Sequence, residues 1–223
     1  MRSAQILTLM VLGDSLSMVR TVDPHDEGPI VRDSDLAVPL NQTYPVLLHC
    51  ALSQQRSQVV YTYNRSDRGF GVANIERDIV YNCLFCKPEV LIFHFGANDC
   101  RFRFEQGRII QLTPYSEFVR LLKRISQAIA FASCKVVTIG IAPPPAALET
   151  RRPGYGREVD RYNDGLKAFS RDCGASFIHI PTLIARRRME EFLLADGYHF
   201  NTKMHQLLGD ELLRTTASFR LVG

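Results

Sequence analysis

The stretch QILTLMVLGDSL, residues 5–16, decides the fold. Residues 5–12 form a nearly continuous apolar run, which is typical of a parallel strand whose sheet is covered by helices on both faces. Gly13 and Asp14 end this run, and Ser15 follows where a turn or helix begins. The stretch therefore predicts a buried first strand that delivers a serine hydroxyl to the carboxyl edge of a parallel sheet, where ligands bind in such folds.

Four further apolar runs of similar length follow, separated by longer segments with helical spacing. The predicted strands are residues 5–12, 58–64, 90–95, 135–141 and 176–180. Alternation of this kind is typical of βαβ units and a mostly parallel sheet.

The segments between the strands are predicted to be helical at residues 43–52, 72–84, 114–132, 159–172, 184–194 and 203–219. In the helix over 114–132, apolar residues recur every three or four positions, so one stripe should be buried. Thr113 is expected to be its N-cap and Pro114 its first helical residue. Residues 19–40, 100–112 and 143–156 are predicted to be loops near the carboxyl edge of the sheet.

The composition is that of an ordinary globular protein: 223 residues, 46% hydrophobic and 22% charged. We expect one domain over residues 1–223. A net charge of +4 is too small to indicate a nucleic-acid binder. No apolar run approaches the roughly 20 residues of a membrane span. The first apolar run leads directly into residues 13–16 without a cleavage site, so we expect no signal peptide and a cytoplasmic protein.

Six cysteines are too few for a disulfide-built scaffold, and free thiols are expected. Cys83 and Cys86 form a CxxC pair, but a zinc site needs a second pair of ligands, and none of comparable spacing occurs. The sequence therefore predicts no metal site.

Three segments contain the groups that nucleophilic serine catalysis needs: a hydroxyl, a base oriented by a carboxylate, and donors for an oxyanion. Ser15 provides the hydroxyl. Asp196 precedes His199 by three residues, so one turn can hold the carboxylate beside the imidazole. Asn98 provides a side-chain amide after the third strand. Taken one at a time, these segments also fit a helix cap or a surface turn.

Taken together, four segments in this order resemble the motifs of the SGNH hydrolase superfamily, also called GDSL esterases and lipases. They are residues 13–16, 64–71, 96–99 and 196–199. The resemblance implies a three-layer α/β/α, flavodoxin-like fold with a five-stranded parallel sheet. It also implies catalysis without a metal or an organic cofactor.

By this resemblance, Ser15 is the nucleophile, His199 the base that takes its proton, and Asp196 the carboxylate that orients His199. The oxyanion hole would comprise the N–H of Ser15, the side-chain amide of Asn98 and the N–H of Gly69.

The assignment of Gly69 is less direct than the others, because Ser66 and Asp67 depart from the family pattern in this segment. Gly71 is the alternative oxyanion-hole glycine.

The sequence thus predicts a serine esterase that removes short acyl groups, above all acetate, from a carbohydrate or a related small molecule. An acyltransferase with the same triad and a non-catalytic binding protein on the same fold are the alternatives. Asp14 and Arg68 are candidate substrate-binding residues. We hypothesise that Arg101 and Arg103 bind an anionic substrate, since guanidinium pairs with carboxylate and phosphate; a solvated charged rim is the other interpretation. The oligomeric state is left open.

Overall fold

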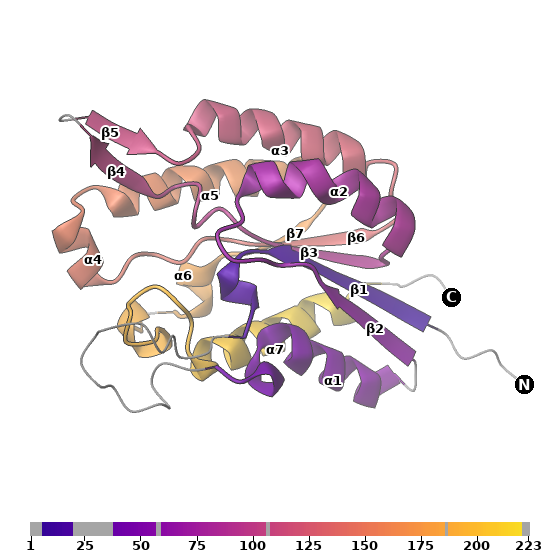
Figure 1. Cartoon of the computed structure of the whole chain (residues 1–223). Coiled ribbons are helices and arrows are strands. Elements are labelled where there is room, and N and C mark those ends of the chain that lie inside the picture. The colour runs from indigo at the N-terminus through magenta and orange to yellow at the C-terminus, as the bar shows by residue number, and fades with distance from the viewer. Residues whose placement is uncertain (1–5, 20–37, 57–58, 106–107, 186, 220–223) are drawn as a thin grey trace, which may run out of the picture.

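The computed structural model describes residues 6–19, 38–56, 59–105, 108–185 and 187–219. Its main sheet has five parallel strands in the order β2-β1-β3-β6-β7 (Figure 1). The strands are β1 (Ile6–Gly13), β2 (Val59–Asn64), β3 (Val90–His94), β6 (Lys135–Ile139) and β7 (Ser176–Ile178). All five predicted strands are confirmed, with ends that differ by one or two residues.

Helices cover both faces of this sheet and complete the predicted three-layer α/β/α fold (Figure 1). One face carries α1 (Tyr44–Arg56) and α7 (Thr202–Ala217). The other face carries α2 (Val72–Cys86), α3 (Tyr115–Ile129) and α5 (Tyr155–Asp172). Every residue of β3 is buried between these layers, which explains why its sequence is a continuous apolar run.

The buried stripe predicted for α3 is confirmed, since Phe118, Leu122 and Ile125 lie in the core. The predicted cap is wrong. Pro114 is the N-cap and makes no side-chain cap bond, while the Thr113 hydroxyl donates to Asp99 Oδ1 at 2.7 Å. The threonine side chain is therefore used in a tertiary contact, which local sequence cannot indicate.

Two of the predicted loops contain regular structure. Residues 100–112 include an antiparallel ribbon of β4 (Phe102–Glu105) and β5 (Arg108–Gln111), because apolar and polar residues alternate there with the period of a strand. Residues 143–156 include α4 (Ala146–Arg151), and α5 starts before the predicted residue 159. The remaining predicted loop covers residues 19–40. Most of it, residues 20–37, lies outside the described residues.

The helix predicted over residues 184–194 is wrong. The chain instead forms the short α6 (Ile180–Leu183), which includes Pro181 in its first turn, and the 3-10 turn η4 (Met189–Phe192). Ala185 has a φ of 54°, in the left-handed region that ends a helix.

All six cysteines are described, and none forms a disulfide. Within the described residues, no helix is both long and apolar enough to cross a membrane. The same residues contain no group of three or more His, Cys, Asp or Glu side chains that could hold a metal ion.

Candidate active site

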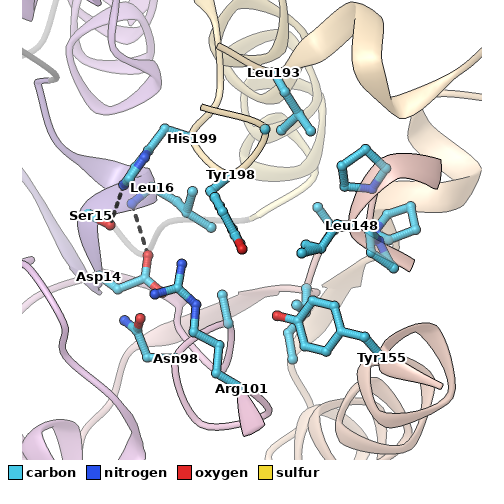
Figure 2. A pocket seen from close by; sticks show the side chains of 17 residues that line it. Asp14, Ser15, Leu16, Asn98, Arg101, Leu148, Tyr155, Leu193, Tyr198 and His199 are labelled. Atoms are coloured by element: carbon cyan, nitrogen blue, oxygen red, sulfur yellow. Dashed lines mark hydrogen bonds between the residues drawn. The ribbon is translucent and has the colours of Figure 1, made fainter. Parts of the chain in front are cut away.

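Ser15 begins the 3-10 turn η1 (Ser15–Ser17), directly after β1. Asp14 caps this turn, because its Oδ1 accepts the N–H of Leu16 at 2.9 Å (Figure 2). The turn packs tightly on the end of β3: a Cβ at Gly13 would lie 2.5 Å from the carbonyl oxygen of His94. Glycine is needed at position 13 for this close approach, which holds Ser15 at the carboxyl edge of the sheet.

The structure brings Ser15, His199 and Asp196 together from opposite ends of the chain. Ser15 Oγ lies 3.0 Å from His199 Nε2 (Figure 2), and His199 Nδ1 lies 2.6 Å from Asp196 Oδ2. The carboxylate accepts a hydrogen bond from Nδ1–H and so favours the tautomer with its proton on Nδ1. Nε2 is then free to accept from the serine hydroxyl. This is the geometry that a nucleophile, its base and an orienting acid require.

Asp196 is held as a carboxylate by three donors. Besides the His199 ring, the backbone N–H groups of Tyr198 and His199 both donate to its Oδ1 at 2.9 Å. Partial burial raises the pKa of Asp196, but the bonds from His199 and Tyr198 outweigh it and lower the pKa to about 2. The carboxylate therefore stays charged beside His199 throughout the neutral range.

Asn98 lies in the turn after β3, where Gly96 has a φ of 109°. Its Nδ2 donates to the carbonyl oxygen of Phe70 at 2.9 Å, which leaves the second amide hydrogen for another acceptor. Asp99 next to it is buried and accepts the N–H of Val72, the first residue of α2. The turn containing Asn98 is thus fixed to the segment that leads into α2.

The two glycines considered for the oxyanion hole differ in environment. A Cβ at Gly71 would lie 2.6 Å from Asp99 Oδ1, and the Gly71 N–H already donates to Asn74 Oδ1 at 3.0 Å. Gly71 is therefore explained by close packing and capping of α2. Gly69 has a left-handed φ of 74° with open space at its Cβ position, but it does not line the pocket beside Ser15.

That pocket has a cavity volume of about 50 Å³ and contains Ser15, His199, Asn98 and Asp14 in its wall (Figure 2). Its other side is apolar, and much of it comes from the loop predicted over residues 143–156. The apolar side is formed by Ile141, Pro143, Pro144, Pro145, Leu148, Tyr155, Leu193 and Tyr198.

Of the proposed substrate-binding arginines, the structure brings only Arg101 to the pocket, with its guanidinium carbon 4.9 Å from the centre of the Tyr198 ring. Arg68 is exposed and does not line the pocket. The side chain of Arg103 lies outside what the structure describes.

Residues 11–207 match the GDSL-like Lipase/Acylhydrolase family. The protein belongs to this family. A GDSL esterase/lipase of Arabidopsis thaliana is 26% identical to it over 139 residues, which are 57% of this chain. The match covers 44% of that relative, so the chain spans less than half of its length.

Solved structures with the same fold include Axe2, an acetylxylan esterase from Geobacillus stearothermophilus. It has a TM-score of 0.70 and 14% identity, with 100% of this chain and 99% of that chain covered. The psychrotrophic esterase EstA from Pseudoalteromonas sp. has a TM-score of 0.65 and 18% identity, with 94% and 96% covered. At these identities the likeness shows the SGNH hydrolase fold that the sequence predicted.

In this GDSL-family protein, a buried polar cluster supports the turn that contains Ser15. Ser17 Oγ lies 2.7 Å from Tyr44 Oη and 3.0 Å from His94 Nδ1. The Asn64 amide donates to the Ser17 carbonyl at 2.8 Å. Burial lowers the pKa of His94 to about 3, so its ring is neutral. Its Nδ1 has Ser17 as a partner, whereas its buried Nε2 has no hydrogen-bond partner among the described residues.

Asp14 is a buried acid as well as the cap of the turn that contains Ser15. It is fully buried, and Oδ2 has no hydrogen-bond partner among the described residues. Burial is the main reason that the pKa of Asp14 rises to about 7; the nearby Asp99 adds to this, while the Leu16 N–H and Arg101 oppose it. Asp14 therefore changes charge near neutral pH at the edge of the Ser15 pocket.

Proposed function

We propose that this protein is a serine esterase in which Ser15, His199 and Asp196 form the catalytic triad. The observation that carries the proposal is the chain of contacts from Ser15 Oγ to His199 Nε2, at 3.0 Å, and from His199 Nδ1 to Asp196 Oδ2, at 2.6 Å. Membership of the GDSL family supports the same assignment.

In the proposed reaction, Ser15 Oγ attacks the ester carbonyl carbon while His199 Nε2 takes the hydroxyl proton. The tetrahedral intermediate collapses, its bond to the alcohol oxygen breaks, and His199 returns the proton to that oxygen. Water then attacks the acyl-serine and gives a proton to His199. The bond between the acyl carbon and Ser15 Oγ breaks, His199 returns the proton to Ser15 Oγ, and the carboxylic acid is released. Asp196 remains ionised and stabilises the imidazolium at each stage.

The oxyanion would be held by the N–H of Ser15, the free amide hydrogen of Asn98 and the N–H of Gly69. Asn98 lies in the pocket wall with Ser15. Gly69 precedes Phe70, whose carbonyl accepts the other hydrogen of the Asn98 amide. The bond between Asn98 and Phe70 therefore ties the Gly69 segment to the pocket, and this supports Gly69 over Gly71, whose N–H is already used.

The size of the pocket favours a short acyl group, above all acetyl. Its cavity volume of about 50 Å³ is a few times the ~10–15 Å³ that a single water needs. Leu148 and Tyr155, which are both buried, close its apolar side. Arg101 would contact the alcohol part of the ester through its guanidinium group. We propose an acetylated carbohydrate as the substrate class, in line with the acetylxylan esterase that shares the fold.

The test is hydrolysis of p-nitrophenyl acetate, butyrate and octanoate at pH 8 by the wild type, Ser15→Ala and Leu148→Ala. We expect the wild type to prefer acetate and Ser15→Ala to lose about 10³-fold or more in kcat. Leu148→Ala should shift the preference toward butyrate, because it enlarges the pocket.

Equal turnover by wild type and Ser15→Ala would refute Ser15 as the nucleophile. Faster transfer of the acyl group to a sugar hydroxyl than to water would instead identify an acyltransferase with the same triad.

A further inference from the structure

A second concave site lies on the α2 side of the sheet, beside the edge strand β2. We call it the α2–β2 groove. Its walls come from the segment after β2, including Ser66 and Phe70, and from α2, including Asn74, Tyr81 and Asn82. Its cavity volume is about 470 Å³, within the range of small-ligand sites and far larger than the pocket beside Ser15.

Two polar side chains in the groove wall differ in accessibility. Asn82 lines the groove and is only 5% exposed, and its amide can donate to and accept from an occupant. Ser66 Oγ is buried without a hydrogen-bond partner among the described residues, and the chain itself encloses it. Of these two side chains, Asn82 is therefore the one that an occupant of the groove would bind.

Further groups in the groove indicate the chemistry of that occupant. Asn74 uses its carbonyl oxygen on the Gly71 N–H, which leaves its amide hydrogens available. Asp67 adds a carboxylate acceptor, and Arg65 carries the opposite charge. Asp78 also lines the groove, but both of its oxygens accept from Arg77, at 2.7 and 2.8 Å. This mixture of amide, hydroxyl and carboxylate groups suits a ligand with many hydroxyls and no net charge.

An aromatic surface borders these polar groups. Tyr81 lines the groove and is 57% exposed, and its ring lies 4.4 Å from that of Phe85, which is 71% exposed. Exposed aromatic faces pack against the apolar C–H faces of sugar rings, while hydroxyls at the ring edge bond to amides and carboxylates. Asn82 and Tyr81 together provide both kinds of contact.

We propose that the α2–β2 groove is a binding site for a short, neutral oligosaccharide. The choice of carbohydrate rests on the proposed function, because the groove would hold sugar units remote from the ester that reacts at Ser15. One hydrogen bond links the two sites: Phe70 lines the groove, and its carbonyl accepts the amide of Asn98, which lines the Ser15 pocket.

Calorimetric titration of the whole protein with xylotetraose, cellotetraose and chitotetraose tests this proposal, since none of the three carries an O-acetyl ester. We expect saturable binding of at least one probe. Tyr81→Ala and Asn82→Leu should each weaken that binding about tenfold. The control is Phe131→Ala, which removes an aromatic ring that is 92% exposed after α3 and does not line the groove; it should bind as the wild type does.

Absence of saturable binding for all three probes would overturn the proposal, as would unchanged affinity in Tyr81→Ala. Because Tyr81 is exposed, that variant remains informative even if Asn82→Leu fails to fold. Hydrolysis of p-nitrophenyl acetate separates the two claims. Tyr81→Ala should keep its kcat/KM, and Ser15→Ala should keep its affinity for the oligosaccharide. A protein that binds the sugar but never cleaves an ester would refute the proposed function and leave the groove assignment standing.

Discussion

Replacing Asp196 by Asn should abolish most activity while leaving the fold intact. Two backbone N–H groups, those of Tyr198 and His199, point at Oδ1, so the amide oxygen of an asparagine must occupy that position. Its NH2 group then faces His199 Nδ1, where Oδ2 now accepts a proton at 2.6 Å. Nδ1 must become an acceptor, the ring proton moves to Nε2, and His199 can no longer accept the proton of Ser15.

Asp196→Asn should change the stability of the protein much less than its kcat. The donors around Asp196 lower its pKa from 3.8 to about 2, a shift of almost two units, which corresponds to about 2 kcal/mol. Since the folded-state pKa is lowered, this stabilisation is fully present above pH 4 and is lost only as the pH falls toward 2. Asp196→Asn keeps the two backbone bonds, so it should lose less than this total. The loss in kcat should be about 10⁴-fold, or about 5 kcal/mol, because the ring is held in the wrong tautomer.

The assay is kcat/KM for p-nitrophenyl acetate at pH 8, with a thermal melt of each protein. Asp210→Asn is the matched control, since Asp210 is an exposed acid on α7 that accepts from Gln206 and lies outside the pocket beside Ser15. A decrease in kcat/KM of less than tenfold in a folded Asp196→Asn protein would refute the assignment of Asp196.

Four further outcomes are expected. Asn98→Ala should lower kcat about 10²- to 10³-fold with little change in KM, because an oxyanion donor is lost; a change confined to KM would contradict this. Asp14→Asn should be increasingly more stable than wild type as pH rises from about 4 to 7, with a constant difference above that, since burial raises the pKa of Asp14 from 3.8 to about 7 and its ionised form destabilises the fold; parallel melting curves across that range would refute the buried acid. Ser17→Ala should lower kcat about tenfold and destabilise the protein by about 1–3 kcal/mol, because Tyr44 and His94 lose a buried partner; unchanged kcat would show that the cluster does not position Ser15. Arg101→Ala should raise KM for esters with an anionic alcohol group and leave KM for neutral esters unchanged, and equal effects on both would refute a charge-specific contact.

The main elements of the fold could be predicted because their signals are local. The strands that became β1 and β3 are continuous apolar runs, and the buried side chains of α3 recur with helical spacing. The ribbon of β4 and β5 was missed because a short alternating segment between a turn and a helix resembles a loop. The helix predicted over residues 184–194 does not form, because Ala185 near its start has a left-handed backbone conformation that alanine rarely adopts.

The candidate site also has a part that the sequence could predict and a part that it could not. Asp196 and His199 are three residues apart, so their contact could be expected from the sequence. Their convergence with Ser15 was expected from the resemblance to the SGNH hydrolase motifs. The support for Ser15 could not be expected, because Tyr44 and His94 are 27 and 77 residues away from Ser17 in the chain.

The apolar pocket wall could be predicted only as a loop over residues 143–156 near the carboxyl edge of the sheet. Leu148 belongs to α4, within a segment rich in proline that reads as a loop. Its position opposite Ser15 depends on how that segment packs on the rest of the fold.

The central claim is that Ser15 is a nucleophile activated by His199, and covalent labelling tests it most directly. The protein would be incubated with a fluorophosphonate at pH 8. Mass spectrometry of the intact protein would count the labels, and peptide mapping would locate the labelled residue. The account predicts one label per chain, on Ser15, with no label on Ser15→Ala and strongly slowed labelling of His199→Ala. Labelling at another residue, or none on the folded wild-type protein, would contradict it.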